Sequence, residues 1–364
     1  MNLNEKEKAI LEILEVNPFI SQQELADSIG LSRSATANLL SGLQSKGYIL
    51  GKAYVLNKNQ GIICIGGANV DHKLILKDAL ALSTSNPVSS ANSVGGVIRN
   101  VAENLGRLGC QVSLMTLLGK DMAANMIVKE SKPYMKLHLT SHLEEASTGQ
   151  YLALLDTKGN MVLGLADMDI CEAMDDKWLS GYKTQLIKSE YLVVDCNVTE
   201  SAISYLLELA RSHQLKLIII GVSSPKMKRL PRNLKGLYAG IFNRDESQSY
   251  FNTSTEDAAE LAELWLKAGL KKVVVTAGSE AFAYGYDDII ETASPIKQDN
   301  LVDVTGAGDS FSAGVIYGLS LGKDMAEAVK YGSINAMHTL MSSDSVPKDI
   351  SAEILEKEKE NYYG

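Results

Sequence analysis

The 364-residue sequence lacks several features that would place it in a structural class at once. It has four cysteines and no Cys-x-x-Cys pair, so neither a disulfide framework nor a zinc site is expected. Its N-terminal stretch has no signal-peptide core, and no apolar run approaches the length that spans a membrane. We therefore expect a cytoplasmic protein with reduced thiols and no membrane partner.

Positive charge is also in short supply. The chain carries 35 Lys and Arg against 44 Asp and Glu, which gives a formal net charge of −9. The chain as a whole therefore gives no electrostatic reason to expect nucleic-acid binding. Its length is sufficient for two domains and a large core.

Two common nucleotide-binding motifs are missing as well. The P-loop pattern Gly-x-x-x-x-Gly-Lys-[Ser/Thr] occurs nowhere, because Gly322-Lys323 precedes Asp324 and lacks the upstream glycine. The dinucleotide fingerprint would need a third glycine where Phe311 stands. A phosphate site in this chain must therefore be built in another way.

What is present is a glycine-rich helix entry at residues 302–314. Gly306 and Gly308 flank Ala307, so no bulky side chain blocks the first backbone N–H groups of the helix. Those N–H groups and the helix dipole favour an anion. Asp309 beside them is suited to take a proton from a hydroxyl that attacks a phosphate, although an ordinary capping Asp is the alternative.

Strands and helices alternate from about residue 61 to the end. This alternation predicts an α/β domain with a mainly parallel sheet between helices. Core strands are expected at 61–67, 191–195, 217–222, 237–242 and 272–276, helices at 201–213, 255–268, 310–321 and 325–340, and a β-hairpin at 148–155 and 161–165. That hairpin is either an ordinary surface feature or a cover over a site.

Polar residues follow the first strand at the edge of the sheet where α/β proteins bind ligands. Asp71 can accept two hydroxyl hydrogen bonds from a sugar there, or it can simply cap a turn. Gly95 and Gly96 allow close approach of the backbone to a ligand, and the amide of Asn100 lies one helical turn later. Farther along, the amide of Asn243 and the carboxylate of Glu246 lie one helical turn apart and suit a hydrated Mg²⁺.

Two of these stretches resemble the signatures of the ribokinase (PfkB) family of sugar and nucleoside kinases. Residues 303–309 resemble its C-terminal signature, and Gly95, Gly96, Asn100 and Ala102 match its N-terminal signature Gly-Gly-x-x-x-Asn-x-Ala. The resemblance covers about residues 62–340 and is greatest to the pseudouridine kinases of the family. It implies a ribokinase-like fold with a small β lid, ATP and Mg²⁺ as cofactors, and K⁺ as a further candidate.

The resemblance also implies a role for each matching residue. Asp309 would be the base, and Gly306, Ala307 and Gly308 would donate N–H groups to the transferred phosphoryl group. The implied sugar contacts are Asn69, Asp71, Gly95, Gly96 and Asn100. The implied nucleotide contacts are Asn243, Thr276, Gly278, Thr305 and Asn335, and the implied magnesium ligands are Asn243 and Glu246.

The chain departs from the family pattern at a few positions. Gly221 stands where an Asp-Pro pair is common, Asp169 replaces an Asn, and Ala281 replaces the second glycine of the nucleotide loop. The implied activity is ATP-dependent phosphorylation of the 5′-hydroxyl of a ribose-containing nucleoside, with pseudouridine as the first candidate. A kinase of a free sugar and a transcription regulator that only senses a sugar or nucleoside are the alternatives.

The first 59 residues form a separate pattern of three helices. A helix at 3–16 is followed by the capping box Ser21–Glu24, a stop at Gly30 and a third helix capped by Ser32. Helix, short turn, helix, and two expected strands at 46–56 resemble the winged helix-turn-helix domains of bacterial regulators. We therefore divide the chain into a DNA-binding domain at 1–59 and a kinase domain at 60–364.

The third helix of this first domain would lie in the DNA major groove. Its expected DNA contacts are Arg33, Ser34, Thr36 and Asn38. The segment has six basic and six acidic residues, so a helical dimerisation module is the alternative reading. A homodimer would present two such segments and so twice the number of basic residues to DNA.

Overall fold

The computed structural model describes residues 3–16, 20–49, 61–298 and 300–364. The chain forms two compact units, Met1–Lys58 and Asn59–Gly364. None of the described helices has both the length and the apolar character needed to cross a bilayer.

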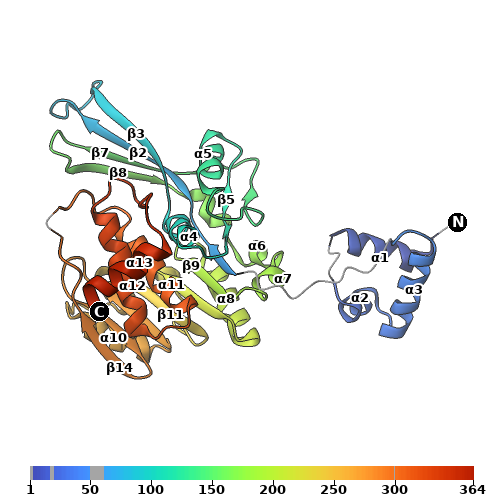
Figure 1. Cartoon of the computed structure of the whole chain (residues 1–364). Helices are drawn as coiled ribbons and strands as arrows, with labels where there is room; N and C mark the ends of the chain where they lie inside the picture. Colours follow the sequence, from blue (N-terminus) through green and yellow to red (C-terminus); the bar gives the residue numbers. More distant parts are fainter. Residues whose placement is uncertain (1–2, 17–19, 50–60, 299) are drawn as a thin grey trace. The chain divides into compact units, whose positions relative to one another are not determined.

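The larger unit is built on an eight-stranded sheet with the order β14-β13-β12-β11-β10-β9-β1-β4 (Figure 1). Strands β4 to β12 of that order are parallel, and β13 and β14 add an antiparallel hairpin at one edge. The strands are β1 Ile62–Ile65, β4 Val112–Met115, β9 Tyr191–Asp195, β10 Lys216–Ile220, β11 Leu237–Asn243, β12 Lys272–Thr276, β13 Phe282–Tyr286 and β14 Ile289–Ala293. The expected mainly parallel sheet is confirmed.

Helices cover both faces of this sheet because its central strands are apolar on both sides. In β1, Ile63 and Ile65 pack into the core of α8 and α10, whereas Ile62 and Cys64 pack into the core of α4, α11 and α12. The long helices are α4 Val97–Arg107, α8 Glu200–His213, α10 Ala258–Lys267, α11 Ala307–Ser320, α12 Met325–Leu340 and α13 Ala352–Tyr363. Further helices are α5 Met122–Ser131, α6 Asp176–Ser180, α7 Lys183–Leu186 and α9 Arg244–Phe251.

A second sheet of four strands, in the order β3-β2-β7-β8, stands away from the first (Figure 1). We call it the lid sheet. Its strands are β2 Asn69–Leu76, β3 Val88–Gly95, β7 Gly149–Leu155 and β8 Met161–Asp167, and a small pair, β5 Leu117–Leu118 and β6 Ser141–His142, lies apart from it. The predicted hairpin is β7 and β8, and the structure extends it by β2 and β3.

One helix boundary matters for the site. The sequence pattern placed the start of α11 at Ser310, but the helix begins at Ala307 with Gly306 as its N-cap. The earlier start places Asp309 inside the first helical turn, next to the unpaired N–H groups.

The smaller unit contains helices α1 Glu5–Val16, α2 Gln22–Ile29 and α3 Arg33–Ser45. The capping box of Ser21 and Glu24 is present, and the left-handed Gly30 (φ 65°) ends α2. Ile10, Leu25, Ile29 and Leu43 form its core. Of the expected wing, residues 46–49 form a turn and a bend, and the remainder lies outside the described residues.

Candidate active site

Asp309 lies in the first turn of α11 and is held from the neighbouring helix α4. The side-chain amide of Asn100 donates a hydrogen bond to Asp309 Oδ2 at 2.8 Å. Burial raises the pKa of Asp309 to about 7, the bond from Asn100 opposes that rise, and the charges of Asp195, Asp71 and Glu246 add to it. A carboxyl group with a pKa near 7 can exchange a proton at neutral pH.

The charge of Asp71 adds to the rise in the pKa of Asp309, so the two carboxylates lie close enough to repel each other. Asp71 lies on β2 of the lid sheet and is half-buried. Asn69 donates to its Oδ1 at 2.6 Å, while burial raises the pKa of Asp71. The two acids come from different elements, Asp71 from β2 and Asp309 from α11, and their convergence on one substrate stays a prediction.

The entry to α11 is open on the side of Gly308. A Cβ added at Gly308 would meet no heavy atom within 4 Å, and the N–H groups of Gly308 and Asp309 have no hydrogen-bond partner in the described part of the chain. The N–H of Ala307 is less free than expected, since it points to Val304 O at 3.3 Å. Gly306 has φ 81° and would place a Cβ 2.3 Å from Ser345 O, so the turn requires glycine there.

The turn before α11 is organised by Asp303, for which the sequence predicted no separate role. Asp303 Oδ1 accepts from both the N–H (2.9 Å) and the hydroxyl (2.7 Å) of Thr305, so the predicted nucleotide contact Thr305 has its hydroxyl proton engaged. Asp303 Oδ2 also lies 3.1 Å from the Nζ of Lys73 on β2. An Asp two residues before a Thr is a recognisable turn signal, but nothing in the sequence points to Lys73.

Gly95 and Gly96 lack side chains at positions where other parts of the protein lie against their backbone. A Cβ at Gly95 would lie 2.0 Å from Asp71 Oδ2, and one at Gly96 (φ 104°) would lie 2.5 Å from Gly67 O. These glycines therefore let the lid strands and the β1 turn come together around the Asp71 carboxylate. Their contact with a sugar stays a prediction.

Asp195 is a buried carboxylate of the site for which the sequence analysis assigned no role. It ends β9 and accepts hydrogen bonds from the N–H of Gly67 and from the backbone and side chain of Asn197 at 2.9 to 3.2 Å. Burial raises its pKa to about 6, against those hydrogen bonds. A polar residue at the end of a central strand is the signal that points to it.

Asn243 and Glu246 form a capping box at the start of α9. Asn243 Oδ1 accepts from the N–H of Glu246, and Glu246 Oε2 accepts from the N–H of Asn243, both at 2.8 Å. The amide oxygen of Asn243 thus accepts one bond in the helix cap and keeps a second lone pair, so its predicted role as a ligand of Mg²⁺ stays a prediction. Glu246 is buried, and burial raises its pKa to about 7.

Because Gly221 has no side chain, the carboxylate of Glu246 can lie against its backbone. A Cβ at Gly221 would lie 1.9 Å from Glu246 Oε2. The departure from the family pattern at this position is therefore matched by the placement of Glu246.

Of the expected nucleotide contacts, Thr276 and Gly278 are accessible to a ligand and Asn335 is not. Thr276 ends β12 half-buried, and Gly278 (φ 62°) forms the open turn that follows. Asn335 was wrongly predicted as an adenine contact, because it is fully buried and its amide donates to Asn104 Oδ1 (3.0 Å) and Ser310 O (2.7 Å). It joins helices α12, α4 and α11 behind the site.

The match to a family model decides how this site is classified. Residues 59–348 match the model described as pfkB family carbohydrate kinase. The chain belongs to this family. Residues 3–49 of this pfkB-family kinase match a second model, described as winged helix-turn-helix DNA-binding.

Relatives of this pfkB-family kinase include a sugar kinase and a pseudouridine kinase. The uncharacterized sugar kinase YeiI of Escherichia coli (strain K12) is 27% identical over 333 residues, covering 90% of this chain and 91% of the relative. The pseudouridine kinase of Escherichia coli (strain K12) is 28% identical over 277 residues, covering 74% of this chain and 87% of the relative.

Solved structures agree on the fold of the pfkB-family kinase. The structure of a carbohydrate kinase from Agrobacterium tumefaciens has a TM-score of 0.74 and 27% identity, covering 82% of this chain and 96% of that chain. The ribokinase of Arabidopsis thaliana, solved with ribose and ATP, has a TM-score of 0.73 at 17% identity, covering 83% of this chain and 99% of that chain. The ribokinase-like α/β fold is therefore confirmed.

The helix-turn-helix unit of this kinase exposes three of the four expected DNA contacts. Arg33, Ser34 and Asn38 are exposed on α3. Thr36 was wrongly predicted, since it is fully buried and its hydroxyl donates to Ser32 O. The positive charge available for DNA phosphates is reduced, because the Nζ of Lys46 pairs with Oε1 of the buried Glu7 at 2.6 Å.

Proposed function

We propose that this pfkB-family kinase transfers the γ-phosphoryl group of ATP to the 5′-hydroxyl of a ribose-containing nucleoside, with pseudouridine as the substrate, and that its first unit binds DNA. The observation that carries the proposal is the placement of Asp309. It lies beside the free N–H groups that open α11, is held by Asn100, and is close enough to Asp71 for the two charges to repel each other.

In the proposed reaction each residue has one task. Asp309 takes the proton of the 5′-hydroxyl as the oxygen attacks phosphorus. The N–H groups of Gly308 and Asp309 stabilise the negative charge of the transferred group. Asp71, held by Asn69, accepts hydrogen bonds from ribose hydroxyls.

The residues present fit ATP with Mg²⁺ in a particular way. No group of three or more His, Cys, Asp or Glu that could hold a metal ion lies within the described ranges. Mg²⁺ would then be bound chiefly by water and phosphate, with Glu246 as the nearby carboxylate, as is usual for this ion. When bound, it neutralises phosphate charge.

The choice of pseudouridine rests on the relative of that activity, which is 28% identical over 277 residues. A free sugar is the second candidate, because a sugar kinase is similar over nearly the whole chain. The test is ADP formation with pseudouridine, uridine, ribose and fructose, with ³¹P NMR to locate the new ester.

The substrate panel separates the candidates. We expect the highest kcat/KM with pseudouridine and phosphate on its 5′-oxygen. A preference for ribose or fructose would make the protein a sugar kinase. Saturable binding without turnover of any of the four compounds would instead support a sensor that regulates transcription.

The proposed DNA contacts are Arg33, Ser34 and Asn38. Arginine and asparagine side chains on a recognition helix can read guanine and adenine edges, and a serine hydroxyl can bind phosphate. Selection of bound fragments from genomic DNA, followed by the Arg33→Ala variant, tests this part. Retention of full affinity by the variant would overturn it.

We propose a homodimer that covers the lid sheet. Met161, Leu163 and Leu165 on β8 are each about half exposed, which is unusual for apolar side chains on one strand. A second copy would bury them. Light scattering of the wild type and of Leu163→Glu tests this, with a monomeric wild type as the contradicting outcome.

A further inference from the structure

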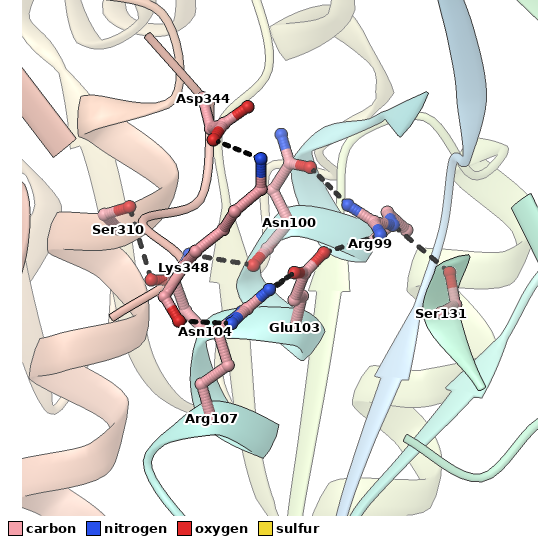
Figure 2. Close-up of polar contacts among 9 residues, drawn as sticks. All are labelled: Arg99, Asn100, Glu103, Asn104, Arg107, Ser131, Ser310, Asp344 and Lys348. Atoms are coloured by element: carbon pink, nitrogen blue, oxygen red, sulfur yellow. Dashed lines mark hydrogen bonds and ion pairs between the residues drawn. The ribbon is translucent and has the colours of Figure 1, made fainter. Parts of the chain in front are cut away.

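A row of buried charge runs along one side of α4, beside the active site. Arg99, Glu103 and Arg107 are four residues apart and therefore share one face of the helix. Glu103 Oε2 lies 2.5 Å from Arg99, and Glu103 Oε1 lies 2.7 Å from Arg107 (Figure 2). Arg99 is 3% exposed and Glu103 is 5% exposed, so the charges are removed from water and held by each other.

The Arg99 guanidinium is also bound to two uncharged neighbours. Its Nε donates to Ser131 Oγ at 3.2 Å, and its Nη1 donates to Asn100 Oδ1 at 3.3 Å. Figure 2 shows Arg99 between Asn100 on one side and Ser131 on the other. The fork of an arginine gives these bonds fixed directions, which the ammonium group of a lysine does not.

These contacts decide the orientation of the Asn100 amide. An asparagine amide presents an oxygen acceptor on one side and an NH₂ donor on the other. Arg99 can only donate, and an ionised Asp309 can only accept. The single orientation that serves both has Oδ1 toward Arg99 and Nδ2 toward Asp309, which is the one observed at 2.8 Å.

We propose that Arg99 is a positioning residue for phosphoryl transfer, because its guanidinium fixes the Asn100 amide with the NH₂ group toward the Asp309 carboxylate. This inference rests on the proposed role of Asp309 as the base. Arg99 itself touches no reacting atom.

The consequence concerns the proton on Asp309. A donor at Nδ2 favours the ionised carboxylate, whereas the charges of Asp71, Asp195 and Glu246 oppose its ionisation. Without Arg99 the amide is free to turn its oxygen toward Asp309, and the carboxylate loses its donor. The charged groups that face Arg99 are Glu103, Glu130, Arg107 and, more distantly, Asp71.

The first experiment is kinetic, with Arg99→Met. We expect the acidic limb of the pH profile of kcat to move up by about one pH unit, kcat at pH 7 to fall about fivefold, and KM to change less than threefold. A cavity of about 310 Å³ lined by Arg99, Glu103 and Arg107 leaves room for water at the shortened side chain. Arg99→Lys keeps the charge and one donor, so it should recover part of the loss.

The matched control is Arg107→Met. It removes a cation from the same Glu103 but has no contact with Asn100, so the acidic limb should stay in place. An equal movement of the limb in Arg107→Met would show a general charge effect and would overturn the proposal. The proposal would also be overturned if the acidic limb of the pH profile of kcat stayed in place in Arg99→Met.

A double-variant cycle shows whether Arg99 acts through Asn100. We expect Asn100→Ala to move the limb at least as far as Arg99→Met, and the combined variant to move it no farther than Asn100→Ala alone. Additive movements would mean that Arg99 acts by another route. Should Arg99→Met not fold, the Arg99→Lys and Asn100→Ala pair is read in the same way.

The inference can also be tested without turnover. Carboxyl ¹³C NMR of aspartate-labelled protein, with Asp309→Asn to assign the signal, gives the pKa of Asp309 directly. A higher pKa in Arg99→Met than in Arg107→Met supports the positioning role even when no compound of the substrate panel is phosphorylated. Equal values in the two variants contradict it, so failure of this inference and failure of the proposed function are distinguishable.

Discussion

The Asp309 carboxylate lies in surroundings that oppose its ionisation. Burial in the first turn of α11 and the charges of Asp195, Asp71 and Glu246 raise its pKa, while the hydrogen bond from Asn100 lowers it. A base must be deprotonated to work, so a pKa near the working pH makes activity sensitive to small changes around it.

The pH dependence of the kinase follows from this balance. The pKa of the folded protein, about 7, lies above the ordinary value of an aspartate, so Asp309 carries a proton in mildly acidic solution. We expect kcat/KM to rise about tenfold per pH unit up to roughly pH 7 and then to level off. A profile that is flat between pH 5 and 8 would mean that Asp309 does not act as the base.

The same pKa affects the free energy of unfolding. A raised folded pKa means that the native state binds more protons than the unfolded chain between about pH 4 and pH 7. The contribution of Asp309 to stability is therefore present at acidic pH and is lost as pH rises through 7.

Gly221→Ala tests the role of Glu246. The added Cβ would approach Glu246 Oε2 to 1.9 Å, so the carboxylate must move and the cap of α9 must loosen. We expect an increase in KM for ATP and a loss of about 1–3 kcal/mol in unfolding free energy. Gly181→Ala is the control, because its nearest neighbour would be 3.5 Å away, and an unchanged KM in Gly221→Ala would contradict the role.

Single residues were predictable where a motif fixed their position. The glycine-rich motif placed Asp309 at the N-terminal end of a helix, as observed, whereas Asp71, expected just after β1, lies inside β2. Thr36 and Asn335 were misjudged because a short polar side chain on a helix can bond the backbone or another helix, and its burial depends on packing that one sequence does not reveal.

At the scale of elements, the lid sheet and the turn before α11 are joined by one ion pair. Lys73 of β2 reaches Asp303, and Asp303 in turn holds Thr305. Hydrogen bonds from Thr305 and Lys73 outweigh burial and lower the pKa of Asp303, so the carboxylate stays charged. A movement of the lid can thereby reach the residues next to Asp309.

Lys73→Met tests this connection. Because the Lys73 side chain is about half exposed, the pair contributes at most about 1 kcal/mol, so we expect up to a fivefold rise in KM for the sugar substrate. Lys73→Arg should keep the pair and the wild-type KM. The connection would be refuted if Lys73→Met and Lys73→Arg gave equal KM values.

Elements with strong local signals were predicted well. The strands of the main sheet are runs of buried aliphatic residues, and β9 and β12 have the expected bounds. Strand β3 was missed, since Val88–Gly95 is rich in serine and contains an asparagine, residue types without strong β propensity. It is a strand because it pairs along its whole length with β2.

At the scale of the whole molecule, each unit has its own hydrophobic core. Ile10, Leu25, Ile29 and Leu43 serve the first unit, and none of the large clusters of the second unit includes them. The division of the chain into two compact units follows the same lines. The site residues of the proposed kinase all lie in the second unit.

The second unit should therefore work alone. We expect residues 59–364 to fold cooperatively and to keep kcat and KM within about twofold of the full chain, because no site residue is removed. Thermal unfolding and the ADP assay on both proteins measure this. A truncated protein that is folded but inactive would show that the first unit takes part in catalysis.

The central claim is that Asp309 removes the proton of the acceptor hydroxyl. The most direct measurement is single-turnover phosphorylation by Asp309→Asn, with calorimetry of substrate binding on the same protein. We expect binding within a few-fold of wild type and a rate lower by about 10²–10⁴-fold. A rate within tenfold of wild type, with binding intact, would contradict the claim.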